Sequence, residues 1–295
     1  MKGKVTNMGM KASNKIATFF KYFVLILVGI IMIYPLLWMI SATFKDNSEI
    51  FAGISLWIKK PTLDGYRNAL NNFGGSINIL QAMLNTYSYV IPKVICTVVS
   101  ACIAAYGFGR FDFPGRKLLF NIMLATLFLP QVVLNVPQYL LYNLYNKFGW
   151  VDSPFYLAIW VHCAFATETY FVYQLVQFMR NVPRDLDEAA AIDGCSSFQT
   201  LYKVIVPMLG PALVSCALFQ FMWSCNDFMG PLLYVSTPGK YPMSLFVKLS
   251  MDGDTGFAWN KILALSLISI LPQLIVFFCA QDQFVEGISA GAVKG

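Results

Sequence analysis

The chain has 295 residues and a formal net charge of +6, with 57% hydrophobic residues, 12% charged residues and a mean hydropathy of +0.60. That composition excludes an ordinary soluble domain and indicates a membrane protein. The basic residues lie between apolar runs rather than in a block interleaved with aromatic residues, so we expect no nucleic-acid partner. The seven cysteines form no C-x-x-C pair and most lie inside apolar runs, which supports neither a disulfide framework nor a zinc site.

Six apolar runs are long enough to cross a bilayer, which takes about 20 mostly apolar residues in a helix. In chain order they cover residues 22–42, 87–108, 118–139, 155–176, 208–234 and 262–280. The sequence therefore predicts an all-α membrane protein with six transmembrane helices. Five lysines and no acid precede the first run, as in a signal peptide, but the run is longer than a signal peptide's apolar region. A weak small-residue site at 40–42 leaves cleavage as the alternative. We expect an uncleaved first span after a cytoplasmic segment over 1–21.

The distribution of lysine and arginine orients these spans. Six spans place both termini on one side, and that side holds 12 basic residues against 8 on the other. Because loops rich in lysine and arginine stay inside, we expect both termini in the cytoplasm of a bacterial cell. Lys93, near the outer end of the second run, is expected to extend its ammonium group toward the interface.

The connection between the fourth and fifth runs carries strong local helix signals. Asn181 and Pro183 suit the start of a helix, and the acidic residues after them favour its positive end. Gly194 can close the helix in the left-handed conformation. The sequence therefore predicts a short helix over 183–193.

A second short helix is predicted after Gly194. Ser196 or Ser197 can cap it, and its apolar residues recur at i, i+3, i+4 and i+7, as Phe198, Leu201, Tyr202 and Ile205. Pro207 then introduces the fifth run. The connection spends about 30 residues on two helices, whereas connections between elements are usually shorter. One interpretation is a surface helix that only joins two spans, and the other is a knob that docks on a partner protein.

The stretch from Glu188 to Gly194, "EAAAIDG", is followed by nine residues and then by "VIVP" at 204–207. This pattern resembles the E-A-A-x-x-x-G-x9-I-x-L-P motif of importer-type ABC transporter permeases, with valine replacing isoleucine at 204 and leucine at 206. In that family the loop is the coupling helix, which sits in a groove of the cytoplasmic ATPase. The resemblance implies a set of ATPase-coupling residues: Glu188, Ala189, Ala190, Asp193, Gly194, Val204, Val206 and Pro207.

Four further stretches resemble the carbohydrate-uptake branch of this family, similar to the smaller membrane subunit of the maltose transporter. They are "PTLDGYRNAL" at 61–70, "AAYGFGRFDFPGRK" at 104–117, "WSCNDFMGPLLY" at 223–234 and "FVEGISAGAVKG" at 284–295. The resemblance implies the type I ABC importer permease fold, as one permease domain over 22–295 with its transmembrane core at about 81–282. The final stretch is either a disordered end or a segment that reaches the ATPase dimer.

The resemblance also implies a function and partners. A sugar or oligosaccharide would cross the cytoplasmic membrane by alternating access, with the help of a second homologous permease subunit, two cytoplasmic ATP-binding subunits and an extracytoplasmic sugar-binding protein. The chain has no G-x-x-x-x-G-K-[ST] loop with which to bind ATP itself, so we expect no enzyme activity. The stretch at 166–180 is slightly similar to permeases for plant-polysaccharide or uronic-acid oligosaccharides.

Ionisable groups at membrane depth usually face a cavity or a partner. Asp227, beside Asn226 and near Trp223, is either a hydrogen-bonded interfacial acid or part of the wall of a sugar pathway. Glu168 either lines that pathway or pairs with a partner subunit. His162, the only histidine, is expected to be a packed polar group.

No second histidine or acidic cluster accompanies these residues, so the sequence predicts no catalytic residue, metal site or cofactor. An ion-coupled secondary carrier acting without an ATPase is the alternative function. A membrane-embedded enzyme is a weaker alternative, because it would need a cluster of histidines or acids.

Overall fold

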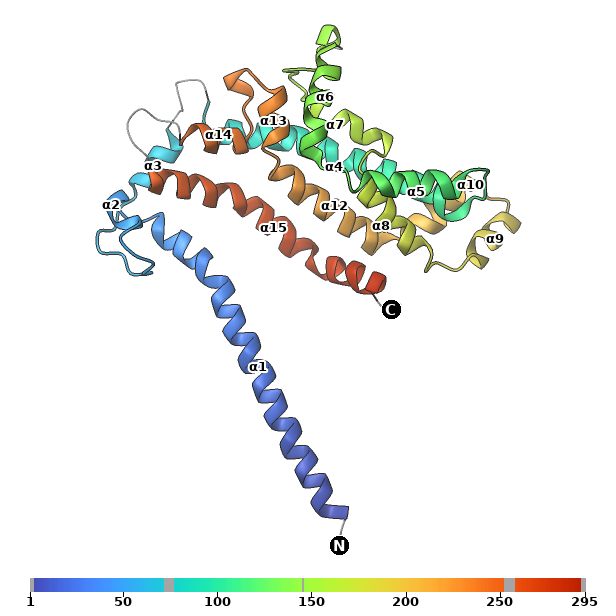
Figure 1. Cartoon of the computed structure of the whole chain (residues 1–295), viewed down its shortest axis with the longest axis horizontal. Coiled ribbons are helices and arrows are strands. Elements are labelled where there is room, and N and C mark those ends of the chain that lie inside the picture. The colour runs from blue at the N-terminus through green and yellow to red at the C-terminus, as the bar shows by residue number, and fades with distance from the viewer. Residues whose placement is uncertain (1–2, 72–76, 145, 252–257, 293–295) are drawn as a thin grey trace. The chain divides into compact units, whose positions relative to one another are not determined.

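The computed structural model describes residues 3–71, 77–144, 146–251 and 258–292 (Figure 1). Over these ranges the chain is mostly helical and forms no strand; a single isolated antiparallel bridge joins Lys45 and Pro61. The expectation of an all-α protein is confirmed. The chain divides into two compact units, Met1–Asn71 with Gly253–Leu267 and Asn72–Asp252 with Ile268–Gly295. The long helix α15 (Trp259–Ala292) contributes residues to both.

The first unit contains α1 (Gly3–Ala42), α2 (Asn47–Ile50) and α3 (Asp64–Leu70). The segment after α2 is held by side-chain hydrogen bonds to three successive carbonyl groups at 54–56. Tyr34 donates to the first, the ammonium group of Lys45 donates to the second at 2.5 Å, and Ser41 donates to the third at 2.6 Å. The carbonyl at 55 thus satisfies the ammonium group of the buried Lys45. In the described part of the chain, no carboxylate lies at ion-pair distance from this lysine.

The second unit is organised around α4 (Ile79–Arg110), which contacts α7 (Leu157–Trp160), α8 (Thr169–Met179), α12 (Gly210–Cys225) and α14 (Met243–Leu249). Figure 1 shows α4 running beside α8 and α12. The remaining elements of this unit are α5 (Arg116–Thr126), α6 (Gln131–Leu144), η1 (Asn146–Phe148), η2 (Val161–Phe165), α9 (Asp185–Ile192), α10 (Ser197–Thr200), η3 (Leu201–Ile205), α11 (Val206–Met208), α13 (Met229–Tyr234) and η4 (Pro238–Lys240).

Small residues let α8 pack closely on α4. Ala101, Ala105 and Gly109 follow one another at intervals of four, so they lie on one face of the helix. Both alanines are fully buried, and a Cβ atom on Gly109 would lie 3.2 Å from the sulfur of Met179. Close approach through small residues is a common way for membrane helices to associate. Phe171 of α8 is fully buried in the same cluster.

The described residues contain three helices that are long and apolar enough to cross a membrane, at Ala17–Ala42, Ile79–Arg110 and Trp259–Phe284. Two bent helix pairs raise the number to five if each is one span. They are Arg116–Thr126 with Gln131–Leu144, bent by 100°, and Ser197–Met208 with Gly210–Cys225, bent by 80°. These elements coincide with five of the six predicted runs.

The remaining predicted run, the fourth along the chain at 155–176, is not one continuous helix. It holds the four-residue α7, the 3-10 turn η2 and most of α8. The helix is interrupted at Ala166, whose φ of 56° belongs to the left-handed region that an alanine seldom adopts and that no α-helix contains. The six-span count therefore stays a prediction, with this run crossing as a broken element.

Candidate functional site

The predicted helix at 183–193 is present as α9, Asp185–Ile192, and its end has the predicted form. Gly194 has a φ of 78°. The backbone N–H groups of Gly194 and Cys195 donate to the carbonyls of Ala191 and Ala190 at 3.1 and 2.9 Å. This is the Schellman arrangement, in which a glycine just after the helix satisfies its last carbonyl groups.

Ser196 begins the second short helix with a full capping box. Its hydroxyl accepts from the backbone N–H of Gln199 at 3.3 Å, and the Gln199 side chain accepts from the Ser196 N–H at 2.8 Å. The predicted apolar face is divided. Leu201 and Ile205 are buried in the core of the second unit, whereas Phe198 and Tyr202 are exposed, with ring centroids 5.7 Å apart.

Most of the predicted coupling residues are open to a partner. Glu188, Ala189, Asp193, Gly194 and Pro207 are exposed, Val204 and Val206 are half-buried, and Ala190 is buried. Ile192, which the motif does not single out, is 87% exposed at the end of α9.

An ion pair that the sequence did not predict joins α9 to the end of α4. The guanidinium Nε of Arg110 lies 3.2 Å from a carboxylate oxygen of Asp187, and its Nη2 donates to the carbonyl of Val182 at 3.0 Å. The Arg110 side chain is only 7% exposed. From the sequence, Arg110 counted only as one basic residue of a cytoplasmic loop. Figure 1 places α9 and α10 at one end of the second unit, with α13 and α14 toward the other.

A cavity of about 720 Å³ lies in the second unit. It is lined by residues of α4, α6, α7, η2, α12 and α13 and of the segments beside them, namely Lys93, Gln131, Leu134, Asn135, Pro137, Gln138, Leu141, Tyr142, Ala158, Ile159, His162, Thr167, Glu168, Gln220, Trp223, Asp227, Met229, Gly230, Leu233 and Tyr234. Of the four predicted pathway residues, Trp223, Asp227 and Glu168 are among them. Asn226 is not, and its amide nitrogen donates instead to the side-chain oxygen of Gln273 at 3.1 Å.

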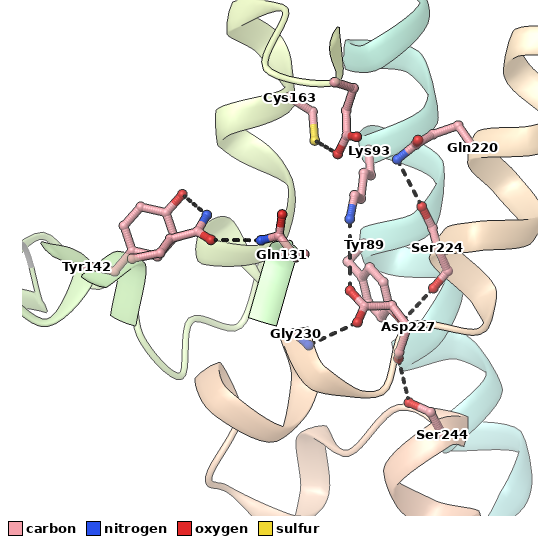
Figure 2. Close-up of polar contacts among 12 residues, drawn as sticks. Tyr89, Lys93, Gln131, Tyr142, Cys163, Gln220, Ser224, Asp227, Gly230 and Ser244 are labelled. Atoms are coloured by element: carbon pink, nitrogen blue, oxygen red, sulfur yellow. Dashed lines mark hydrogen bonds and ion pairs between the residues drawn. The ribbon is translucent and has the colours of Figure 1, made fainter. Parts of the chain in front are cut away.

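Asp227 is held in the cavity wall by several partners. Its carboxylate lies 3.9 Å from the ammonium group of Lys93 and accepts the backbone N–H of Gly230 at 2.9 Å (Figure 2). The hydroxyl of Ser244 donates to its backbone carbonyl at 3.0 Å. A Cβ atom on Gly230 would lie 2.6 Å from the carboxylate, so a larger residue at 230 would require the Asp227 side chain to move. Lys93 was missed as a site residue because its partner lies far away in the sequence.

Two aromatic groups face the cavity. Trp223 packs against Tyr170, Phe171 and Phe219, with ring centroids 5.2–6.0 Å apart. Tyr142 and Tyr234 form a second group, with centroids 5.4 Å apart. Side-chain amides border the same space: Gln138 donates to the hydroxyl of Tyr142 at 3.1 Å, and Gln131 donates to Gln138 at 3.4 Å. Rings beside amides can contact both the faces and the hydroxyl groups of a polar ligand.

Glu168 borders the cavity at the break in the 155–176 run. The thiol of Cys163 donates to its carboxylate at 3.6 Å. The possible ligand atoms of His162, Cys163 and Glu168 all lie within 4.8 Å of one another, so this trio could hold a metal ion, although the sequence predicts no metal site. The three residues are close in the sequence, and the break of the helix at Ala166 brings Glu168 back toward His162 and Cys163. The sequence alone did not reveal this grouping, because it predicts one continuous helix over 155–176.

The family model described as "binding-protein-dependent transport system inner membrane component" matches residues 97–286. That range contains α9, the turn at Gly194 and most of the residues that line the cavity. The chain therefore belongs to this family of importer permeases, and it is an inner membrane protein that crosses the membrane more than once.

Relatives with known transport systems cover most of the chain. The α-glucoside transport system permease protein AglG of Rhizobium meliloti is 34% identical over 236 residues, which are 79% of this chain and 60% of that protein. The trehalose/maltose transport system permease protein MalG of Thermococcus litoralis is 31% identical over 270 residues, 92% of this chain and 94% of that protein. The resemblance to permeases of carbohydrate-uptake transporters is confirmed.

The fold is also similar to that of a solved transporter. A crystal structure of a bacterial ABC transporter involved in the import of the acidic polysaccharide alginate matches with a TM-score of 0.75 at 18% identity, covering 92% of this chain and 98% of that chain. A second structure, of an alginate transporter in complex with an alginate pentasaccharide-bound periplasmic protein, matches with a TM-score of 0.60 at 16% identity. At these identities the likeness shows the fold alone.

Proposed function

We propose that this chain is one of two permease subunits of an ATP-driven importer that moves a sugar or oligosaccharide by alternating access. Its partners are a second homologous permease, two cytoplasmic ATP-binding subunits and an extracytoplasmic sugar-binding protein. The family and the names of the relatives support this proposal. The six-span topology, with both termini and α9 in the cytoplasm, belongs to the proposal.

One observation carries the mechanism: helix α4 connects the exposed loop helix with the cavity. Arg110, at the end of α4, pairs with Asp187 of α9, and Lys93 of the same helix lines the cavity. These two residues are 17 positions apart (110 minus 93), which is about 25 Å along a helix. Movement of α9 by an ATPase would therefore be transmitted along α4 to the wall of the cavity.

In this proposal α9 is the coupling helix, and the motif residues Glu188, Ala189, Asp193 and Gly194 make the contact with the ATPase. The exposed Ile192 adds an apolar anchor beside them. The short side chains of the alanines allow a partner's backbone to approach closely. Closure of the ATPases would pull α9 and convert an inward-facing pathway into an outward-facing one.

We further propose that the cavity is one wall of the sugar pathway. Trp223 offers a ring face, and Asp227 and Glu168 offer acceptors for hydroxyl groups. Asn226 does not line this cavity and stays a candidate only as the neighbour of Asp227 in the sequence. The competing function, an ion-coupled carrier acting alone, is disfavoured by membership of a family named for its dependence on a binding protein.

The test is transport and ATPase activity of the reconstituted complex, with and without the binding protein, for wild type and two variants. Gly194→Pro removes the N–H that bonds Ala191 and forbids a φ of 78°, so sugar uptake should collapse while membrane insertion persists. Gly194→Asn is the comparison, because asparagine tolerates the left-handed region and this chain leaves open space for its side chain. It keeps the turn, so a loss of uptake in Gly194→Asn would reflect the contact with the ATPase rather than the shape of the turn. Uptake by this chain alone, driven by an ion gradient, would overturn the proposal.

A further inference from the structure

Acidic side chains outnumber lysines and arginines among the described residues that line the cavity. Glu168 and Asp227 are the two acids, and Lys93 is the one lysine or arginine among these residues. Lys93 and Asp227 lie 3.9 Å apart with 12% and 24% of their side chains exposed, so each compensates the other. His162 lies beside Glu168 in the same lining.

Glu168 carries the negative charge that the Lys93–Asp227 pair leaves uncompensated. Among the described residues, no lysine, arginine or histidine lies within ion-pair distance of its carboxylate, and the hydrogen bond given to it comes from the thiol of Cys163. A carboxylate that borders a cavity with apolar walls projects its field into the cavity more strongly than it would on an open surface. The cavity therefore repels anions.

The other polar groups in the lining suit a ligand without charge. Gln131, Asn135, Gln138 and Gln220 present amides, and Trp223 presents an aromatic ring. Amides bond hydroxyl groups in either direction, as donor or acceptor, and a ring face packs on the apolar face of a sugar. A cation binds the carboxylate of a uronic acid more strongly than a neutral donor does, and Lys93, the one lysine or arginine among the described lining residues, is already paired with Asp227.

We propose that the cavity wall contributed by this chain favours uncharged oligosaccharides and discriminates against anionic ones, with Glu168 as the specificity-determining residue. The inference rests on the proposed function and names its substrate class. It opposes the slight similarity of 166–180 to permeases for uronic-acid oligosaccharides. The fold likeness to an alginate importer, at 18% identity, does not bear on the charge of the substrate.

The first experiment measures the electrostatic sign of the cavity and needs no knowledge of the sugar. Asn135→Cys places a thiol in the lining, and the assembled complex is treated at pH 8 with a cationic or an anionic methanethiosulfonate reagent. Peptide mass spectrometry separates modification at 135 from that of the seven native cysteines. Rates are normalised to those of a free thiol. The cationic reagent should react faster by on the order of tenfold.

Glu168→Gln in the Asn135→Cys chain should bring the ratio of cationic to anionic rates close to one. Asp64→Asn, which removes an equal charge from an exposed site in the first unit, should leave the ratio unchanged. An anionic reagent that reacts as fast as the cationic one in the parent, or a ratio that Glu168→Gln does not move, would overturn the inference.

The second experiment measures selection during transport. Proteoliposomes holding the complete complex are supplied with binding protein and with saturating maltotriose, xylotriose or trigalacturonate, and the affinity of the binding protein for each is measured separately. Glu168→Gln should raise the maximal rate for trigalacturonate relative to the neutral trisaccharides by about tenfold. Equal maximal rates for acidic and neutral probes in the wild type would overturn the inference. Uptake that needs no ATP would instead overturn the proposed function.

Discussion

At the scale of single residues, the cavity depends on charges whose partners come from distant parts of the chain. Asp227 at the end of α12 meets Lys93 of α4, and its second carboxylate oxygen accepts the N–H of Gly230. Both charged side chains are partly buried. Removing one partner from such a pair leaves the other charge uncompensated, which costs more than the pair itself contributes.

Lys93→Met and Asp227→Asn should each lower stability by roughly 1–3 kcal/mol, less than the loss expected for a fully buried pair. The double variant should recover part of the loss, because it leaves no lone charge. Thermal unfolding in detergent measures this. Arg67→Met is the control, since the Arg67–Asp64 pair is 77% and 62% exposed and should contribute little. Losses that simply add in the double variant would show that the two charges do not interact.

The environment of Asp152, which lies outside the membrane-spanning segments, predicts that the stability of the folded chain depends on pH. Burial favours a higher pKa for its carboxyl group, but hydrogen bonds from Thr237 and Ser236 and the charge of Lys240 outweigh it and hold the pKa below the ordinary value of 3.8. A lowered pKa stabilises the folded state above the unfolded pKa of about 3.9, and this contribution is lost as the pH falls through the folded pKa.

Asp152→Asn should therefore lower the unfolding temperature by roughly 1–3 °C at pH 7, and the difference from wild type should disappear well below pH 4. Asparagine tolerates the φ of 52° at this position, and its oxygen can still accept the backbone N–H groups of Ser236 and Thr237. It loses the second acceptor oxygen, which bonds the Thr237 hydroxyl and faces Lys240, as a protonated aspartic acid also does. Unfolding temperatures across pH 3–8 measure it. A difference that grows on acidification would contradict the assignment.

At the scale of elements, the loop helix α9 is built by local signals and positioned by one distant residue. The Schellman turn at Gly194 and the capping box at Ser196 use neighbours in the sequence. The position of α9 on the second unit depends on Arg110, which forms an ion pair with Asp187 and donates a hydrogen bond to the carbonyl of Val182. A planar guanidinium group can hold both at once, whereas an ammonium group offers no comparable fork.

Arg110→Gln should reduce sugar uptake per ATP hydrolysed by roughly tenfold, because α9 could then move without moving α4. Arg110→Lys should give a ratio of uptake to hydrolysis between those of wild type and Arg110→Gln, since lysine keeps the positive charge but loses the planar guanidinium group. Arg116→Gln is the matched control, as Arg116 pairs only locally with the exposed Asp112. The ratio of uptake to ATP hydrolysis in proteoliposomes measures the effect. An unchanged ratio in Arg110→Gln would contradict the role of α4 in transmission.

At the scale of the whole molecule, the open question is how many times the chain crosses the bilayer. Among the residues that the structure describes, three helices and two bent pairs account for up to five spans. The run at 155–176 is broken at Ala166, yet it is closely packed, because α7, η2 and α8 all contact α4. Irregular backbone at membrane depth is tolerated where protein or a cavity covers it. We therefore expect this run to cross the bilayer as well, which makes six crossings in all.

Six crossings predict that the α9–α10 loop and the η4 loop lie on opposite sides of the membrane. In intact cells an impermeant maleimide should modify Gly239→Cys and should not modify Ser197→Cys until the cells are opened. Peptide mass spectrometry locates the modification among the native cysteines. Five crossings with 155–176 outside the bilayer would exchange the two sides, because the bent span at 197–225 still separates the two positions. With the N-terminus in the cytoplasm, Ser197→Cys would then be modified in intact cells and Gly239→Cys would not.

The sequence alone predicted the features that depend on near neighbours or on average composition. The helical class, the membrane location and the approximate limits of the apolar runs follow from the desolvation of long apolar stretches. The turn at Gly194 and the cap at Ser196 follow from backbone hydrogen bonds within six residues. The family motif at 188–207 was visible for the same reason, since all of it lies in one loop.

Only the tertiary structure decided which side chains share a site. Lys93 meets Asp227, Arg110 meets Asp187, and the break at Ala166 turns Glu168 toward Cys163 and into the cavity wall. The periodicity of a helix says which face is apolar, and it does not say which distant charge will lie opposite a lysine. Pairing across helices depends on how the elements pack, so the charge of the cavity could be read only from the folded chain.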